Sequence, residues 1–142
     1  MPRMAPPEFR GVQRAGDGFI PIDSACRVPG DARVYAAGDA TSYPVKHGGI
    51  GAQMADTAAA GIAALAGADV EPEAFQPVIR GALLTGGKEP IYLSARLIGP
   101  RGFESEVFDE PPWPADEKVI AEELGPYLSG LDDLKSTRTR AG

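Results

Sequence analysis

Residues 34–66 hold the side chains whose types and spacing could do chemistry. A short apolar run, VYAA at 34–37, is followed at once by Gly38 and Asp39. Glycine has no Cβ, so a ligand or another stretch of backbone can approach Gly38 closely. The carboxylate of Asp39 can accept a hydrogen bond from a hydroxyl group, such as that of a sugar or a sugar alcohol. Gly38 and Asp39 are therefore the first candidate binding residues.

A second group of candidates lies where a loop leads into a predicted helix. Lys46, His47, Gly48 and Gly49 come directly before or at the start of this helix. The first N–H groups of a helix have no partner inside it and carry the positive end of its dipole. Such a helix start favours an anionic or electron-rich oxygen. Lys46 can add a full positive charge there, and His47 can offer a hydrogen bond.

Each of these residues also has an ordinary structural explanation. Glycine–aspartate pairs often turn the chain after a strand and bind nothing. Lysine and histidine in a loop are commonly solvated, and glycines at a helix start can provide flexibility alone. Considered without further context, the residues are compatible with a ligand site and with a bare turn.

The counts of special residues exclude several classes of protein. Cys26 is the single cysteine, which excludes an internal disulfide or a paired redox motif, and His47 is the single histidine. One of each argues against a closed zinc site. The net charge of −6 argues against broad nucleic-acid binding. No apolar stretch is long enough for a membrane span and no secretory leader is recognisable, so we expect a cytoplasmic chain.

The elements expected around the candidate residues are two short strands and a long helix. Residues 19–22 suit a short edge strand because of Pro21, and residues 34–37 suit a strand that is buried on both faces. Residues 50–66 repeat apolar side chains at helical spacing. Gly67 is the expected helix end. The apolar face of the helix comprises Ile50, Met54, Ala58, Ile62 and Leu65.

The remainder of the chain predicts a hairpin, a crossing and a last helix. Residues 78–84 and 90–97 flank a turn-rich connection, which is typical of a β-hairpin. Residues 99–115 are rich in proline and acid, and we expect an irregular crossing there. Asp116 is the expected cap of a final helix that Pro126 kinks or restarts. We therefore expect three parts: strands, a loop and a helix at 1–67, a hairpin and a helix at 68–134 and a disordered tail at 135–142.

Residues 34–41, with the sequence VYAAGDAT, resemble the second FAD-binding motif of the pyridine nucleotide-disulfide oxidoreductase superfamily. The preceding DGFIPID at 17–23 is similar to that family's approach to the motif. The runs PVIRGALLTG at 77–86 and PIYL at 90–93 resemble the C-terminal region of its sulfide:quinone reductase and type-two NADH dehydrogenase branch. The resemblance implies an α/β parent and an α+β chain here. Residues 1–67 would be the C-terminal portion of a Rossmann-like FAD-binding half-domain, and residues 68–134 a hairpin-plus-helix interface region before the tail at 135–142.

The resemblance also implies roles for the candidate residues. The acid that matches Asp39 binds the ribityl chain of FAD, and Gly38 lets the backbone approach the cofactor. The helix start at Gly48 and Gly49 faces the pyrimidine edge of the flavin, where Lys46 adds charge and His47 hydrogen-bonds the flavin or lines the quinone side. The implied function is hydride transfer from NAD(P)H to FAD, with electrons passed to a quinone or another acceptor.

Two parts of the family pattern are missing from this sequence. The G-x-G-x-x-G motif that holds the FAD phosphates is absent, and the nearest string, at 49–54, has Met54 in the last glycine slot. The NAD(P)-binding insert is absent as well. We therefore expect the end of a longer flavoenzyme that binds FAD weakly or not at all by itself. The single cysteine also argues against sulfide oxidation by a pair of thiols.

An alternative to the flavoprotein hypothesis is a non-catalytic, cofactor-free interaction module or a truncated piece of a protein. A strand at 34–37 without neighbours would expose an apolar edge, which invites pairing with another copy. We therefore expect a homodimer that does not bind nucleic acid. Peripheral membrane contact is compatible with the parent enzyme that the resemblance implies.

Overall fold

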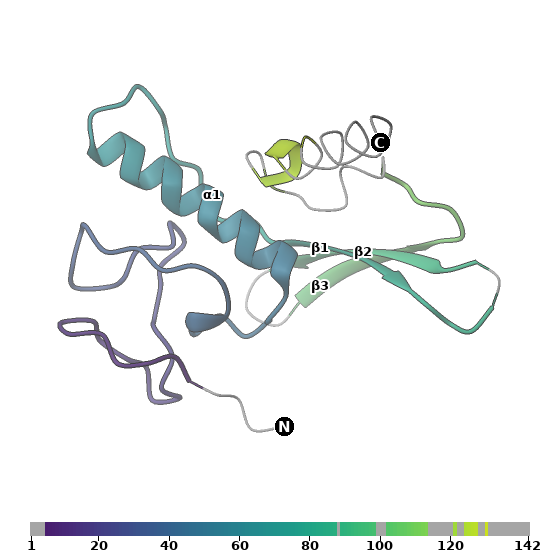
Figure 1. Ribbon diagram of the computed structural model, residues 1–142, viewed down its shortest axis with the longest axis horizontal. Helices are drawn as coiled ribbons and strands as arrows, with labels where there is room; N and C mark the ends of the chain where they lie inside the picture. Colours follow the sequence, from purple (N-terminus) through teal and green to yellow (C-terminus); the bar gives the residue numbers. More distant parts are fainter. Residues whose placement is uncertain are drawn as a thin grey trace, which may run out of the picture. The chain divides into compact units, whose positions relative to one another are not determined.

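A computed structural model describes residues 5–87, 89–98, 102–113, 121, 124–127 and 130. The chain divides into two compact units at residues 76 and 77. The first unit contains a single-turn 3-10 helix, η1 (Gly38–Ala40), and the long helix α1 (Gly48–Leu65); the second contains the strands β1 (Val78–Leu83), β2 (Ile91–Ile98) and β3 (Gly102–Phe108) (Figure 1). A helix and an antiparallel sheet confirm the α+β class. The tail expected at 135–142 and the cap at Asp116 lie outside the described residues, while 124–127 are helical.

Helix α1 begins two residues before its apolar pattern does. His47 is its N-cap, and its Nδ1 accepts a hydrogen bond of 3.2 Å from the Gly49 N–H. The cap side chain satisfies one of the N–H groups that the first turn leaves without a partner, so the helix can start at Gly48. At the other end the φ of Gly67 is +93°, and the predicted stop at this glycine is confirmed. Among the described residues, no helix is both long and apolar enough to cross a membrane.

The buried face of α1 differs in part from the predicted one. Ile50, Met54 and Ala58 are buried as expected, but Ile62 and Leu65 are 51% and 56% exposed. Gly61 takes the next buried position instead. A Cβ at this glycine would lie 2.8 Å from the Tyr35 ring, so the absence of a side chain lets the tyrosine pack against the helix. The buried face of α1 therefore continues through Gly61 to Tyr35, and Ile62 and Leu65 lie outside this face.

The strands predicted at 19–22 and 34–37 are wrong, because each segment forms only one bridge. Ile20 pairs with Thr41 in parallel, and Arg27 pairs with Tyr35 in antiparallel orientation. Pro21 has no N–H to donate to a ladder beyond Ile20. The second segment ends at Gly38, whose φ of +71° turns the chain away from an extended path.

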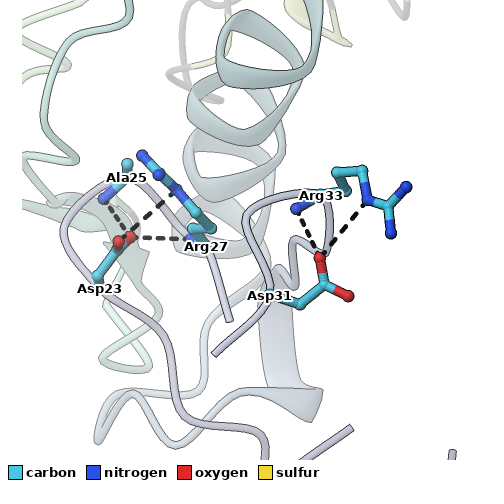
Figure 2. Close-up of polar contacts among 5 residues, drawn as sticks. All are labelled: Asp23, Ala25, Arg27, Asp31 and Arg33. Atoms are coloured by element: carbon cyan, nitrogen blue, oxygen red, sulfur yellow. Dashed lines mark hydrogen bonds and ion pairs between the residues drawn. The ribbon is translucent and has the colours of Figure 1, made fainter. Parts of the chain in front are cut away.

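Carboxylates organise the irregular part of the first unit (Figure 2). The Asp23 Oδ1 accepts hydrogen bonds of 2.9 Å from the N–H groups of Ala25 and Arg27, and the Asp31 Oδ1 accepts one of 2.9 Å from the Arg33 N–H. Each aspartate also forms an ion pair with an arginine side chain. The Arg27 Nε lies 3.8 Å from an Asp23 carboxylate oxygen, and the Arg33 Nε lies 3.9 Å from one of Asp31. These ion pairs are exposed and stabilise little, so the backbone bonds are the part that fixes the turns.

The second unit is a three-stranded antiparallel sheet in the order β1-β2-β3 (Figure 1). The predicted hairpin is confirmed, with Val78 opposite Arg96 and Leu83 opposite Ile91. The irregular crossing predicted at 99–115 is wrong for 102–108, which form β3. Phe103 and Val107 alternate with glutamates along this strand, and this period of two is the signal of a half-covered strand.

The register separates two chemically different faces of the sheet. One face, which we call the uncharged face, has no ionisable side chain; it comprises Ile79, Gly81, Leu83, Ile91, Leu93, Ala95, Leu97, Phe103, Ser105 and Val107. The other face carries Arg80, Arg96, Glu104 and Glu106. Trp113 packs on this charged side, with its ring 6.1 Å from that of Tyr92 and the Arg80 guanidinium 5.2 Å from its centroid. Alternation of side chains thus leaves one polar face that the tryptophan partly covers and one apolar face.

The close approach of Gly102, at the start of β3, to Ile98, at the end of β2, gives a stability test. A Cβ at Gly102 would lie 2.7 Å from the Ile98 carbonyl oxygen, whereas one at Gly87 would meet nothing closer than 3.5 Å. We expect Gly102→Ala to lower the free energy of unfolding by about 1–3 kcal/mol, because the backbone must shift. The control Gly87→Ala should change it by less than about 0.5 kcal/mol. Urea denaturation measures both, and equal values for the two variants would contradict the close approach of Gly102 to the Ile98 carbonyl oxygen.

Candidate functional site

The glycine–acid pair forms a closed turn at η1. Ala37 is extended, and the chain then reverses at Gly38, whose φ of +71° strongly favours glycine. The N–H and the Oγ1 of Thr41 both donate to the Gly38 carbonyl oxygen, at 3.1 Å and 2.9 Å. Thr41 is completely buried. One threonine therefore closes the turn from inside the unit and leaves Asp39 at its outer side.

The turn packs directly on the start of α1 through two glycines. A Cβ at Gly51 would lie 3.2 Å from the Gly38 Cα, closer than side chains normally approach. The Gly38 N–H also donates to the Sδ of Met54 at 3.2 Å. The structure thus brings the predicted binding turn and the predicted helix start together.

Asp39 has a carboxylate that the described part of the chain does not use. Its side chain is exposed, and it forms no hydrogen bond or ion pair with another described residue. A carboxylate has several acceptor positions, and these are open here to a hydroxyl donor. The hydroxyl-binding role predicted for Asp39 is compatible with this geometry.

Lys46 and His47 are engaged by their own loop. The Lys46 Nζ donates to the Thr41 carbonyl oxygen and lies 4.3 Å from the centroid of the Phe19 ring. The Lys46 ammonium therefore lies beside the turn, and its hydrogen bond stabilises the turn. The Nδ1 of His47 accepts from the Gly49 N–H, so this nitrogen carries no proton in the capped arrangement. The ring is exposed, and its Nε2 is the atom that could meet a ligand.

The three glycines at the start of α1, Gly48, Gly49 and Gly51, have different surroundings. A Cβ at Gly48 would meet nothing within 4 Å, while one at Gly49 would lie 3.3 Å from the His47 ring. Gly51 is the glycine that the contact with the turn requires. Gln53 also donates from Nε2 to the Gly49 carbonyl oxygen at 2.9 Å, which stabilises the first turn.

Two residues of the site escaped the sequence analysis. Thr41 was identified only as the end of the motif, and Met54 only as part of an apolar helix face. The spacing of three residues from Gly38 to Thr41 is a signal for a side chain that closes a local turn. Met54 gave no such signal, since its contact with Gly38 spans sixteen residues.

Cys26 lies in the first unit but is unsuited to chemistry. Its side chain is fully buried, and its φ of +58° is in the left-handed region. Burial, and then the charge of Asp23, raises the pKa of the Cys26 thiol to about 11. The thiol is therefore protonated at neutral pH and is not a nucleophile there.

The charged face of the second unit contains an open hollow of about 580 Å³. It is lined by Val78, Ser94, Arg96, Glu104, Ser105 and Glu106. Arg96 lies directly opposite Glu104 in the register, so charges of both signs line the hollow. Among the described residues, no group of three histidine, cysteine or acidic side chains lies close enough to hold a metal ion.

No protein-family model, curated protein or solved structure matches this chain. The function is therefore argued from the motif and from the geometry of the turn and the helix start. The site offers an exposed carboxylate that could accept from hydroxyl groups and the positive end of the α1 dipole beside it.

The contact between the two glycines predicts opposite results for two substitutions in the first turn of α1. Gly48→Ala should be neutral or stabilise the chain by up to about 1 kcal/mol, since alanine favours the helix and meets no neighbour. Gly51→Ala should cost about 1–3 kcal/mol relative to Gly48→Ala, because its methyl group pushes on the Gly38 backbone. Thermal unfolding of both variants measures the difference. Equal stabilities would show that the turn does not rest on the helix.

Proposed function

We propose that this chain forms the ribityl and isoalloxazine side of the FAD site of an oxidoreductase. The single observation that supports this best is the exposed, unused carboxylate of Asp39 on a glycine turn that packs against the start of α1. The N–H groups of the described residues leave this carboxylate available to a ligand. Asp23 and Asp31 differ from Asp39, because their carboxylates accept hydrogen bonds from nearby backbone N–H groups.

The chain's own residues would bind and orient the cofactor. Asp39 would accept hydrogen bonds from ribityl hydroxyl groups, and Gly38 would let the cofactor approach the backbone. The Gly48 N–H and the dipole of the helix start at Gly48 and Gly49 would stabilise negative charge on the pyrimidine edge, while the Gly49 N–H stays with the His47 cap. When bound, FAD supplies the hydride-accepting chemistry. The His47 Nε2 would offer one more polar contact at this edge.

The rest of the reaction depends on parts that this sequence does not contain. We propose a parent enzyme that takes a hydride from NAD(P)H and passes electrons to a quinone or another acceptor in the cytoplasm. The phosphate-binding glycine motif and the NAD(P) domain are not found among the 142 residues. Since the phosphate contacts supply much of a dinucleotide's affinity, the chain alone should bind FAD weakly.

The visible spectrum of the chain tests the flavin site. We expect a colourless protein that quenches or shifts added flavin with weak affinity. Asp39→Asn should weaken FAD binding by about tenfold, because it removes a charged acceptor. Asp69→Asn is the matched control, since Asp69 is an exposed acid of the same unit. Equal affinities of the two variants would contradict the site, and no binding by the unaltered chain would favour the cofactor-free module described next.

A second candidate function is a cofactor-free dimeric module, and the uncharged face of the sheet favours it. Phe103, Val107 and Leu83 on this face are 68%, 64% and 53% exposed. Exposed apolar surface of this kind marks interaction sites. A face without charge has no electrostatic obstacle to its own copy, so the proposed partner is a second chain in a two-fold pair.

Sedimentation of the chain at several concentrations tests the dimer. We expect twice the monomer mass, and we expect Phe103→Glu to shift the chain to monomer by placing a charge in the interface. Ala82→Glu is the control, because Ala82 is an exposed strand position on the opposite, charged face. A monomeric mass for the unaltered chain at high concentration would contradict the dimer, as would dissociation by both variants.

A further inference from the structure

We propose that Met54 is a positioning residue of this site, which holds the glycine–acid turn through a hydrogen bond from the Gly38 N–H to its sulfur. The consequence for ligand binding rests on the proposed flavin function. The consequence for the turn itself does not, because it concerns only contacts within the chain.

The geometry places the Met54 sulfur between two donors of the turn. The Gly38 N–H lies 3.2 Å from the Sδ, and the Thr41 Oγ1 lies 4.0 Å from it. Met54 is 1% exposed, so water does not compete for the sulfur. Thioethers are weak acceptors, and a dry environment is where such a bond contributes.

The bond matters because the turn offers the Gly38 N–H no other acceptor among the described residues. The 3-10 turn uses the Gly38 carbonyl oxygen, which receives both donors of Thr41, but not its N–H. A half-buried N–H without a partner is costly, so loss of the sulfur would favour a turn rotated toward water.

Asp39 follows Gly38 directly and lies inside the segment that the two bonds fix. Met54 holds the start of the turn, and Thr41 holds its end. A rotation at Gly38 would move the Asp39 carboxylate with it. The orientation of the Asp39 carboxylate is therefore set by the buried Met54 side chain. Met54 would thus affect ligand binding without contacting the ligand.

Packing alone is the competing explanation, since Met54 also belongs to the buried face of α1. Ile50 shares this face and is equally buried, but donates or accepts no side-chain bond. Ile50→Leu is therefore the control for a change of shape in the same place. Met54→Leu keeps the apolar volume and removes the acceptor, and Met54→Gln supplies an oxygen acceptor on a chain of similar length.

The readout is the Gly38 amide in the flavin-free chain, observed by NMR. We expect Met54→Leu to speed hydrogen exchange at this amide by about tenfold relative to Ile50→Leu, with partial recovery in Met54→Gln. FAD binding, measured in parallel, should weaken in the same order. Selenomethionine labelling adds a measurement that leaves the fold intact: the Gly38 amide proton should shift more than that of Ala37.

The outcomes separate this proposal from the flavin function. An unchanged Gly38 amide in Met54→Leu and in the selenomethionine chain would overturn the positioning role, whatever the flavin data show. A responsive Gly38 amide in a chain that binds no FAD would support the positioning role and favour the cofactor-free module over the flavin function. Equal loss of FAD binding in Met54→Leu and Ile50→Leu would overturn the claim that the sulfur directs the ligand.

Discussion

The close approach of two backbones, at Gly38 and Gly51, is the constraint on which the first unit depends. A Cβ at Gly51 would lie 3.2 Å from the Gly38 Cα and crowd the turn, whereas at Gly38 it is the left-handed φ that favours glycine. Once these backbones touch, the Thr41 hydroxyl, the Met54 sulfur and the Lys46 ammonium all fall within reach of the turn. The polar contacts of the site are therefore consequences of a steric fit between two residues without side chains.

Much of the first unit is held by bonds from side chains to backbone. Among its described residues, 5–76, the two bridges are isolated pairs and the regular secondary structure is η1 and α1. Carboxylates at Asp23 and Asp31 fix turns that no sheet supports, and His47 fixes the helix start. The high glycine and proline content belongs to this architecture, because tight turns need both residues. A small apolar core then suffices to join the loops to the helix.

Elements with a clear period were predictable from the sequence, and contacts between distant residues were not. The helix, its end at Gly67 and the hairpin follow from local patterns that need no partner to be recognised. Strand β3 also had a period of two, but the proline and acid around it favoured a loop. The strand expected at 34–37 failed for the opposite reason: its apolar run was suitable, yet a strand exists only when a neighbour pairs with it along its length. At the site, residue types identified Gly38 and Asp39, whereas the contribution of Met54 required the fold. The flavin assignment stays a prediction from the resemblance and the free carboxylate.

The burial of Cys26 has a practical consequence for redox behaviour. With its pKa raised to about 11 by burial, the thiol is protonated at pH 7, and the thiolate is the form that reacts with oxidants and disulfides. The left-handed backbone and complete burial leave this sulfur no path to solvent without local unfolding. We therefore expect the one cysteine of the folded chain to react slowly with oxidants and disulfides. Any assembly that it forms without reducing agent is held by noncovalent contacts.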